Sequence, residues 1–184
     1  MRKLKSVSYE EVSTFFNKVH PVDETSIHFA GNKWAMKHLE WADEVAVGTW
    51  SLCELEASEV LAIVCAHHAA EGTDTVLVPE TGRTLQDLVA DLQRRTGEYA
   101  ENNPECWAKM AYWEGKDFSP VLLSTEPTME GKGRRSLVDP SLGSLFHQDG
   151  LHRLVRWALD GRFEAEIYAK NPQVTAYIAG EITI

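Results

Sequence analysis

The chain has 184 residues, of which 43% are hydrophobic and 25% are charged, and these proportions are typical of a globular domain with a sizeable core. Its 18 basic and 28 acidic residues give a formal net charge of −10, which argues against nucleic acids and anionic membranes as partners. No stretch approaches the roughly 18 apolar residues of a membrane-spanning helix, and no apolar run follows Met1–Lys5 as in a signal peptide.

The first 72 residues are predicted to be mainly helical. Ser8 and Glu11 match a capping box in front of apolar residues at helical spacing, and His20-Pro21 ends that helix. The further elements expected in this region are helices over residues 34–42 and 51–72 and a short strand over residues 45–47. We therefore expect residues 1–72 to form a helical N-terminal extension.

From residue 73 onward, short apolar segments alternate with helices. Thr84 is a candidate N-cap for a helix that stops at Gly97, and Asn103 with Pro104 at the first helical position begins another helix. The predicted strands cover residues 75–78, 120–124, 142–146 and 164–170, with one more in the tail, and the predicted helices cover 84–97, 103–115 and 150–160. This pattern predicts an α/β fold whose core is residues 73–184.

The segment from Phe146 to Trp157 contains an unusual concentration of charge at a predicted helix start. Asp149 is a candidate N-cap, and His152 and Arg153 follow Gly150 within the first turn of the helix. Cations are disfavoured at a helix N-terminus, which carries positive partial charge. Free backbone N–H groups together with basic side chains form a binding site for anions, so we expect a phosphate-bearing ligand here.

The order of elements over residues 75–170, together with the sequence Asp149-Gly150-Leu151-His152-Arg153, resembles the ParB N-terminal/sulfiredoxin-like superfamily. Members carry a D-G-x-H-R or G-x-H-R element between a strand and a helix, and this element holds nucleotide phosphates. The superfamily includes chromosome-partitioning CTPases, sulfiredoxins, ParB-like nucleases and free-serine kinases. The resemblance implies a core with a small mixed sheet that binds a nucleotide.

Three features of the sequence favour the free-serine-kinase branch of this superfamily. Sulfiredoxins need a cysteine where Leu151 stands, and the acidic charge of the chain disagrees with chromosome partitioning. The kinases have a glutamate after the first core strand, where this chain has Glu80. The resemblance therefore implies a cytoplasmic, nucleotide-dependent phosphotransferase that acts on a small hydroxyl-bearing metabolite such as an amino acid.

In such a kinase, Glu80 would accept the hydroxyl proton, Asp149 would bind Mg²⁺, and His152 would act on the phosphoryl group of ATP or ADP. The residues expected to bind the nucleotide are Gly150, Leu151, His152, Arg153 and, from a Gly-rich loop, Lys132, Arg134 and Arg135. A structural interpretation competes with each role, because Asp149 is also a helix cap and charged loops are usually solvated. The cysteines Cys53, Cys65 and Cys106 form no CxxC pair, which is typical of a reduced, cytoplasmic compartment.

Two alternative functions follow from the same residues. The first is a nucleotide-binding regulatory or interaction module without turnover. The second is a metal-dependent oxygenase, because His147 and Asp149 form an H-x-D pair like that of non-haem iron enzymes. The third ligand of such a site would come from His20, His28, His38, His67 or His68. His67 and His68 also have a simpler interpretation, at the end of a predicted helix where histidines interact well with the helix dipole.

Overall fold

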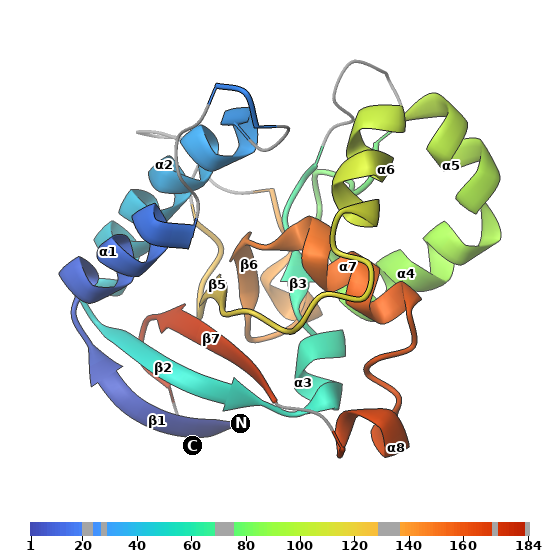
Figure 1. Cartoon of the computed structure of the whole chain (residues 1–184). Helices are drawn as coiled ribbons and strands as arrows, with labels where there is room; N and C mark the ends of the chain where they lie inside the picture. The colour runs from blue at the N-terminus through green and yellow to red at the C-terminus, as the bar shows by residue number, and fades with distance from the viewer. Residues whose placement is uncertain (20–23, 27–28, 69–75, 129–136, 171–172, 183–184) are drawn as a thin grey trace.

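The computed structural model describes residues 1–19, 24–26, 29–68, 76–128, 137–170 and 173–182, and gives only the backbone at residues 29–32 and 34 (Figure 1). Within this part of the chain, one seven-stranded mixed sheet has the order β1-β2-β7-β5-β6-β3-β4. The strands are β1 (Arg2–Val7), β2 (Trp50–Leu55), β3 (Val64–Cys65), β4 (Arg83–Thr84), β5 (Val121–Ser124), β6 (Phe146–Asp149) and β7 (Val174–Ala179). The β5–β7 and β3–β6 pairs are parallel, and the other neighbours are antiparallel.

Helices cover both faces of this sheet. They are α1 (Tyr9–Val19), α2 (Phe29–Ala46), α3 (Ala57–Leu61), α4 (Leu85–Arg94), α5 (Thr96–Asn102), α6 (Pro104–Ala111), α7 (Leu151–Leu159) and α8 (Ala165–Tyr168), with a 3₁₀ turn at Pro140–Leu142. In Figure 1, α1 and α2 lie together on one side of the sheet, and α4, α5, α6 and α7 lie on the other. The α/β class predicted from the sequence is confirmed.

Two hydrophobic cores correspond to the two faces. The larger core lies beneath α4, α6 and α7 and includes Leu88, Met110, Leu154 and Trp157, all fully buried. The smaller core lies beneath α1 and α2 and is made mainly by these residues: Val12, Phe16, Leu39, Trp50 and Tyr177. Strand β7 contributes to both cores, because alternate side chains of a strand point to opposite faces.

The prediction of a mainly helical N-terminal region is wrong for residues 50–55. The Ser51–Glu54 capping pattern lies in β2, a strand that pairs with β1 on one side and with β7 on the other. Pairing on both edges and burial on both faces outweigh a four-residue capping signal. Glu54 consequently forms an ion pair with Arg2 of β1 instead of closing a helix start. Strands β1, β2 and β3 all come from the first 72 residues and belong to the same sheet as the later strands.

Three other predicted strands differ from the observed elements. Residues 45–46 are the end of α2, and Val47 follows in a left-handed conformation with a φ of 49°. The strand expected at 142–146 is instead β6, which begins at Phe146 after the 3₁₀ turn. The strand expected at 164–170 contains α8, where the Tyr168 hydroxyl donates to Leu55 O at 2.6 Å and accepts from Val174 N at 2.8 Å.

Several local signals do predict the observed structure. Helix α1 follows Ser8, whose Oγ accepts from Glu11 N at 3.1 Å, and Thr84 caps α4 by accepting from Asp87 N at 3.2 Å. Pro104 occupies the first turn of α6, as expected. Of the strand predicted at 75–78, Thr75 lies outside the described residues, and Val78 forms an isolated bridge with His68. No helix in the described ranges combines the length and the apolar character needed to cross a membrane.

Candidate metal centre

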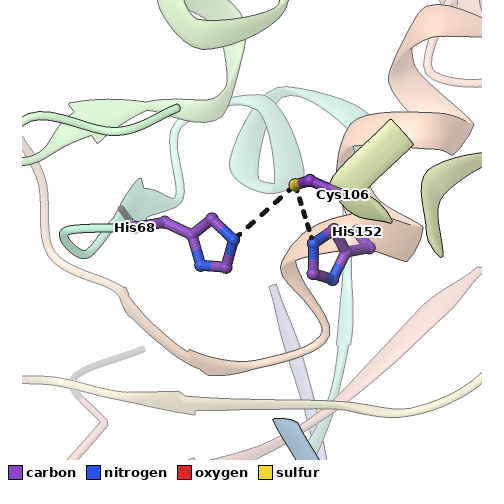
Figure 2. A group of neighbouring side chains, drawn as sticks. All are labelled: His68, Cys106 and His152. Carbon is purple, nitrogen blue, oxygen red and sulfur yellow. Dashed lines mark hydrogen bonds between the residues drawn. The ribbon is translucent and has the colours of Figure 1, made fainter. Parts of the chain in front are cut away.

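Three side chains from distant parts of the chain meet beside the start of α7 (Figure 2). The Sγ atom of Cys106 lies 3.2 Å from Nε2 of His152 and 3.7 Å from Nε2 of His68. The two imidazole rings meet edge to face with their centroids 5.1 Å apart. We call His68, Cys106 and His152 the histidine–cysteine cluster.

The two histidines are brought together by neighbouring parallel strands. Strand β3 pairs with β6 in parallel through Val64 and Phe146. His68 lies three residues beyond the last residue of β3, and His152 lies three residues beyond the last residue of β6. The carboxyl ends of parallel strands share one edge of a sheet, where ligand sites of α/β proteins commonly form. The backbone of His68 is also fixed, because its N–H donates to Val78 O at 3.1 Å.

The helical layer supplies the third member of the cluster. Cys106 is the third residue of α6, a helix that begins at Pro104 and packs against α7. The side chain of Cys106 is fully buried, whereas His68 and His152 are each partly exposed. The two imidazoles are thus the more exposed members of the cluster, and the sulfur is the buried one.

The geometry of the cluster agrees with the coordination of one metal ion. Bond lengths of about 2.3 Å to sulfur and about 2.0–2.1 Å to nitrogen place the two ligand atoms of a tetrahedral zinc site about 3.5 Å apart. The two S···N distances of 3.2 and 3.7 Å lie on either side of this value, and all three ligand atoms lie within 4.8 Å of one another. In the described ranges, no other group of three or more His, Cys, Asp or Glu side chains is spaced to hold a metal.

Comparison with known proteins places the whole chain in one family. The model of DUF6309, a family of unknown function, matches residues 1–184. The chain belongs to DUF6309. No curated protein and no solved structure matches it significantly. All three cluster residues lie within the region that the DUF6309 model matches.

The other two cysteines of this DUF6309 protein have different surroundings. Cys65 is fully buried, and burial raises the pKa of its thiol to about 12. Burial also raises the pKa of the Cys53 thiol. Neither residue belongs to the cluster, and a thiol that stays protonated is a poor metal ligand. Of the three thiols, only that of Cys106 has imidazole nitrogens in a metal-binding arrangement.

The predicted phosphate-binding residues at the start of α7 have varied environments. Gly150 occupies the N-cap position with a φ of 104°, and Leu151 is buried in the larger core. Arg153 is 3% exposed, and its Nη2 donates to Asp149 Oδ2 at 3.0 Å while its Nη1 donates to Ser119 Oγ at 3.1 Å. The expectation that Asp149 caps α7 is wrong, because this carboxylate pairs with Arg153 and the cap is Gly150. A Mg²⁺ ion at Asp149 would therefore compete with a buried guanidinium.

The remaining predicted site residues lie apart from the cluster or outside the described residues. Glu80 is exposed on the turn that follows Val78, the bridge partner of His68. Lys132, Arg134 and Arg135 fall outside the residues that the structure describes. Of the residues assigned to catalysis from the sequence, only His152 belongs to the cluster.

The H-x-D pair proposed for an oxygenase does not assemble with a third ligand in the described ranges. His147 is nevertheless unusual, because its Nε2 is buried and has no hydrogen-bond partner among the residues that the structure describes. Burial lowers the pKa of His147 to about 3, opposed by the negative charge of Asp149 and reinforced by His38 and His68. His147 is therefore a neutral imidazole close to the cluster at ordinary pH.

Sequence reasoning did not identify Cys106 as a functional residue. The residue lies 38 positions from His68 and 46 positions from His152, so no local spacing connects the three. His68 was considered as a distant third ligand for an H-x-D site, but in combination with His147 and Asp149. The available signal is weaker: Cys106 lies two residues after Pro104, in the first turn that follows a clear Asn-Pro helix start, where thiolates are favoured by the helix dipole.

Proposed function

We propose that the histidine–cysteine cluster binds one zinc ion and that this DUF6309 protein is a zinc-dependent hydrolase. The observation that carries the proposal is the convergence of one sulfur and two imidazole nitrogens within 4.8 Å. A thiolate with two imidazoles is a ligand set typical of zinc, and cobalt binds to the same kind of set.

The number of ligands supports a catalytic rather than a structural ion. Structural zinc sites generally use four protein ligands, whereas catalytic sites use three and leave one position for water or substrate. The cluster supplies three ligands within the described ranges. His68 and His152 are partly exposed, which is compatible with a fourth position that water could occupy.

The chemistry that follows is hydrolysis. Zinc supplies a bound water whose pKa falls to about 7, and it polarises a carbonyl or phosphoryl oxygen. In that reaction the water oxygen would form a bond to the carbonyl carbon or phosphorus, the bond to the leaving group would break, and the water proton would pass to the leaving group. Water is the only co-reactant, so the reaction needs neither an oxidant nor a reductant.

A cysteine nucleophile is the main competing interpretation of the same geometry. Cys106 and His152 lie at hydrogen-bond distance, as a nucleophile and its base do. The side chain of Cys106 is 0% exposed, however, so a substrate carbon has no direct approach to its sulfur. Metal coordination needs no substrate contact with the sulfur and also uses the partly exposed His68, so the metal centre accounts for more of the geometry.

Metal analysis of the purified protein tests this proposal. The wild type should bind about one zinc per chain after removal of metal and reloading, and His68→Ala, Cys106→Ala and His152→Ala should each reduce that occupancy strongly. His67→Ala is a control for effects on this segment: His67 adjoins His68 and contacts Val78 O through Nδ1, the same carbonyl oxygen that accepts from His68 N, but it lies outside the cluster. Zinc-dependent hydrolysis of a panel of esters, amides and phosphoesters would support catalysis. Full zinc occupancy in Cys106→Ala would contradict the proposed ligand set.

A nucleotide-dependent phosphotransferase is a second proposal, supported by the resemblance at Asp149–Arg153 and by the glycine turn between β6 and α7. In this proposal the protein is cytoplasmic and its partners are ATP or ADP, Mg²⁺ and a small hydroxyl-bearing metabolite. Incubation with ATP, ADP or CTP, Mg²⁺ and a panel of amino acids would reveal a phosphorylated product by mass spectrometry. Nucleotide binding without a phosphorylated product would favour the nucleotide-binding regulatory module. No nucleotide binding would exclude both the phosphotransferase and the regulatory module.

A further inference from the structure

Arg153 is a buried cation next to a candidate metal ligand. Its guanidinium forms an ion pair with Asp149, four positions earlier, across the start of α7. Burial lowers the pKa of Arg153, and the charge of Asp149 opposes that effect. A buried ion pair is weak evidence for a stabilising role, because desolvation offsets much of the attraction. Its role in this protein is therefore sought in the contacts that it makes rather than in a gain of stability.

The contacts of Arg153 show that it holds together the elements that carry the ligands. Its Nη1 donates to Ser119 Oγ, just before β5, and its guanidinium carbon lies 5.7 Å from the centre of the Trp113 ring. Trp113 follows directly on α6, the helix that carries Cys106. Through these contacts, one side chain links the end of β6, the first turn of α7 and the chain that leaves α6.

The guanidinium also packs against the turn that begins α7. A Cβ atom at Gly150 would lie 2.6 Å from Nε and 3.0 Å from Nη2 of Arg153. The Arg153 side chain therefore occupies the space above Gly150, the left-handed N-cap. His152 lies between Gly150 and Arg153 in the sequence. A change in this contact would move the first turn of α7, and the imidazole of His152 would move with it.

We propose that Arg153 and Asp149 act as a positioning pair that holds His152 in place against Cys106. This inference rests on the proposed metal centre. Residues behind the ligands of a metal site commonly set ligand orientation, and their substitution typically lowers metal affinity about 10- to 100-fold. On this proposal, the buried charges of Arg153 and Asp149 serve to place the His152 imidazole rather than to stabilise the fold.

The same helix provides a matched control. Arg156, one turn further along α7, forms ion pairs with Glu114 at 2.9 Å and Asp160 at 2.7 Å, and its side chain is 15% exposed. Substitution of Arg153 or of Arg156 removes one largely buried cation from α7. Only Arg153 contacts Asp149 and the N-cap turn, so only its loss should disturb His152.

Cobalt binding to the full chain tests the inference, because the visible spectrum of Co²⁺ reports the geometry of its ligands. Arg153→Met should lower cobalt affinity about 10- to 100-fold and shift the ligand-field bands. Arg156→Met should leave both unchanged within about twofold. Arg153→Lys should lie between, because a lysine point charge does not reproduce the fork that contacts Asp149 and Ser119 together.

Each result has a distinct meaning. Equal effects of Arg153→Met and Arg156→Met on affinity and spectrum would overturn the positioning role and leave a purely structural one. If Arg153→Met does not fold, Arg153→Lys and Asp149→Asn decide the question, and unchanged cobalt spectra in both would reject the inference. If the wild type binds no cobalt or zinc, the proposed metal centre itself is wrong, and the positioning role falls with it.

Discussion

The Sγ atom of Cys106 and the Nε2 atom of His152 lie 3.2 Å apart, although 46 positions separate the two residues in the sequence. The packing of α6 on α7 creates this contact. The contact consequently exists only in the folded chain, and an ion held by the two residues together binds the folded state more tightly than the unfolded chain. Binding to the folded state raises the free energy of unfolding, and this linkage gives a first prediction.

Zinc should stabilise the wild type but not the Cys106→Ala variant. At a free zinc concentration 100 times the dissociation constant, the gain in unfolding free energy is about 2.7 kcal/mol. Urea unfolding with zinc, and with zinc removed by a chelator, measures this gain. Cys53→Ala serves as the control, because Cys53 is a buried cysteine outside the cluster and its variant should keep the zinc effect. An equal gain in both variants would show that zinc binds elsewhere.

Stability should depend on pH through His147. Burial lowers the pKa of His147 to about 3 in the folded protein, whereas it is near the ordinary value of 6.5 in the unfolded chain, so the unfolded chain binds the extra proton between these values. The unfolding free energy should therefore rise with pH across this window and fall on acidification, by at most about 1.4 kcal/mol per pH unit from this group. The metal-free wild type and His147→Gln should be compared by urea unfolding between pH 6.5 and pH 5.

The variant in this experiment should show a shallower pH dependence than the wild type. His67→Gln is the control, because His67 is exposed and should keep the wild-type slope. Identical slopes for the wild type and His147→Gln would mean that His147 is not held neutral by burial.

Gly150→Ala should destabilise the protein, whereas Gly97→Ala should not. A side chain at position 150 meets both a φ of 104° and the guanidinium of Arg153 at 2.6 Å. Gly97 lies within α5 with open space where its Cβ would be. We expect Gly150→Ala to lower the unfolding free energy by more than about 1 kcal/mol and Gly97→Ala to raise it by up to about 1 kcal/mol. Urea unfolding of the two variants provides the comparison, and equal changes would contradict the proposed packing over Gly150.

Glu80→Gln tests the second proposal at little risk to the fold. Glu80 is exposed on a turn, and surface substitutions usually change stability by no more than about 0.5 kcal/mol. If Glu80 is the base of a phosphotransferase, the variant should lose turnover far more than nucleotide affinity. Product formation measures turnover, and calorimetry measures nucleotide affinity. Equal loss of both would argue against the role of a base, and Glu126→Gln, another exposed glutamate, controls for the loss of charge.

Local signals in the sequence predicted those elements whose ends are set by nearby residues. Thr84 and Pro104 mark the starts of α4 and α6, and the apolar spacing after Gly150 marks α7. Strand β2 was misassigned because its identity depends on β1 and β7, which pair with its two edges. Ser51–Glu54 meets a helix-capping pattern by chance, and pairing with distant strands outweighs it.

The candidate site was predictable only in part for a related reason. His152 was identified because the cations near Gly150 are unusual at a helix start. His68 and Cys106 join it through the parallel pairing of β3 with β6 and through the packing of α6 on α7. Such long-range contacts leave no periodic mark in the sequence, so the partners of His152 emerge only from the folded structure.

The ends of the sheet have a consequence for how copies of this protein behave toward one another. An unpaired edge strand offers free backbone groups on which another chain can assemble. Within the described ranges, strand β1 forms one edge and carries Arg2, Lys3 and Lys5 in exposed positions, and charged side chains along an edge strand hinder pairing with another chain. Arg2 and Lys5 are also held in ion pairs, with Glu54 and Glu11. The opposite edge, β4, has only two residues and gives little template for pairing. The charged side chains of β1 and the short length of β4 thus make both edges poor templates for pairing with another chain.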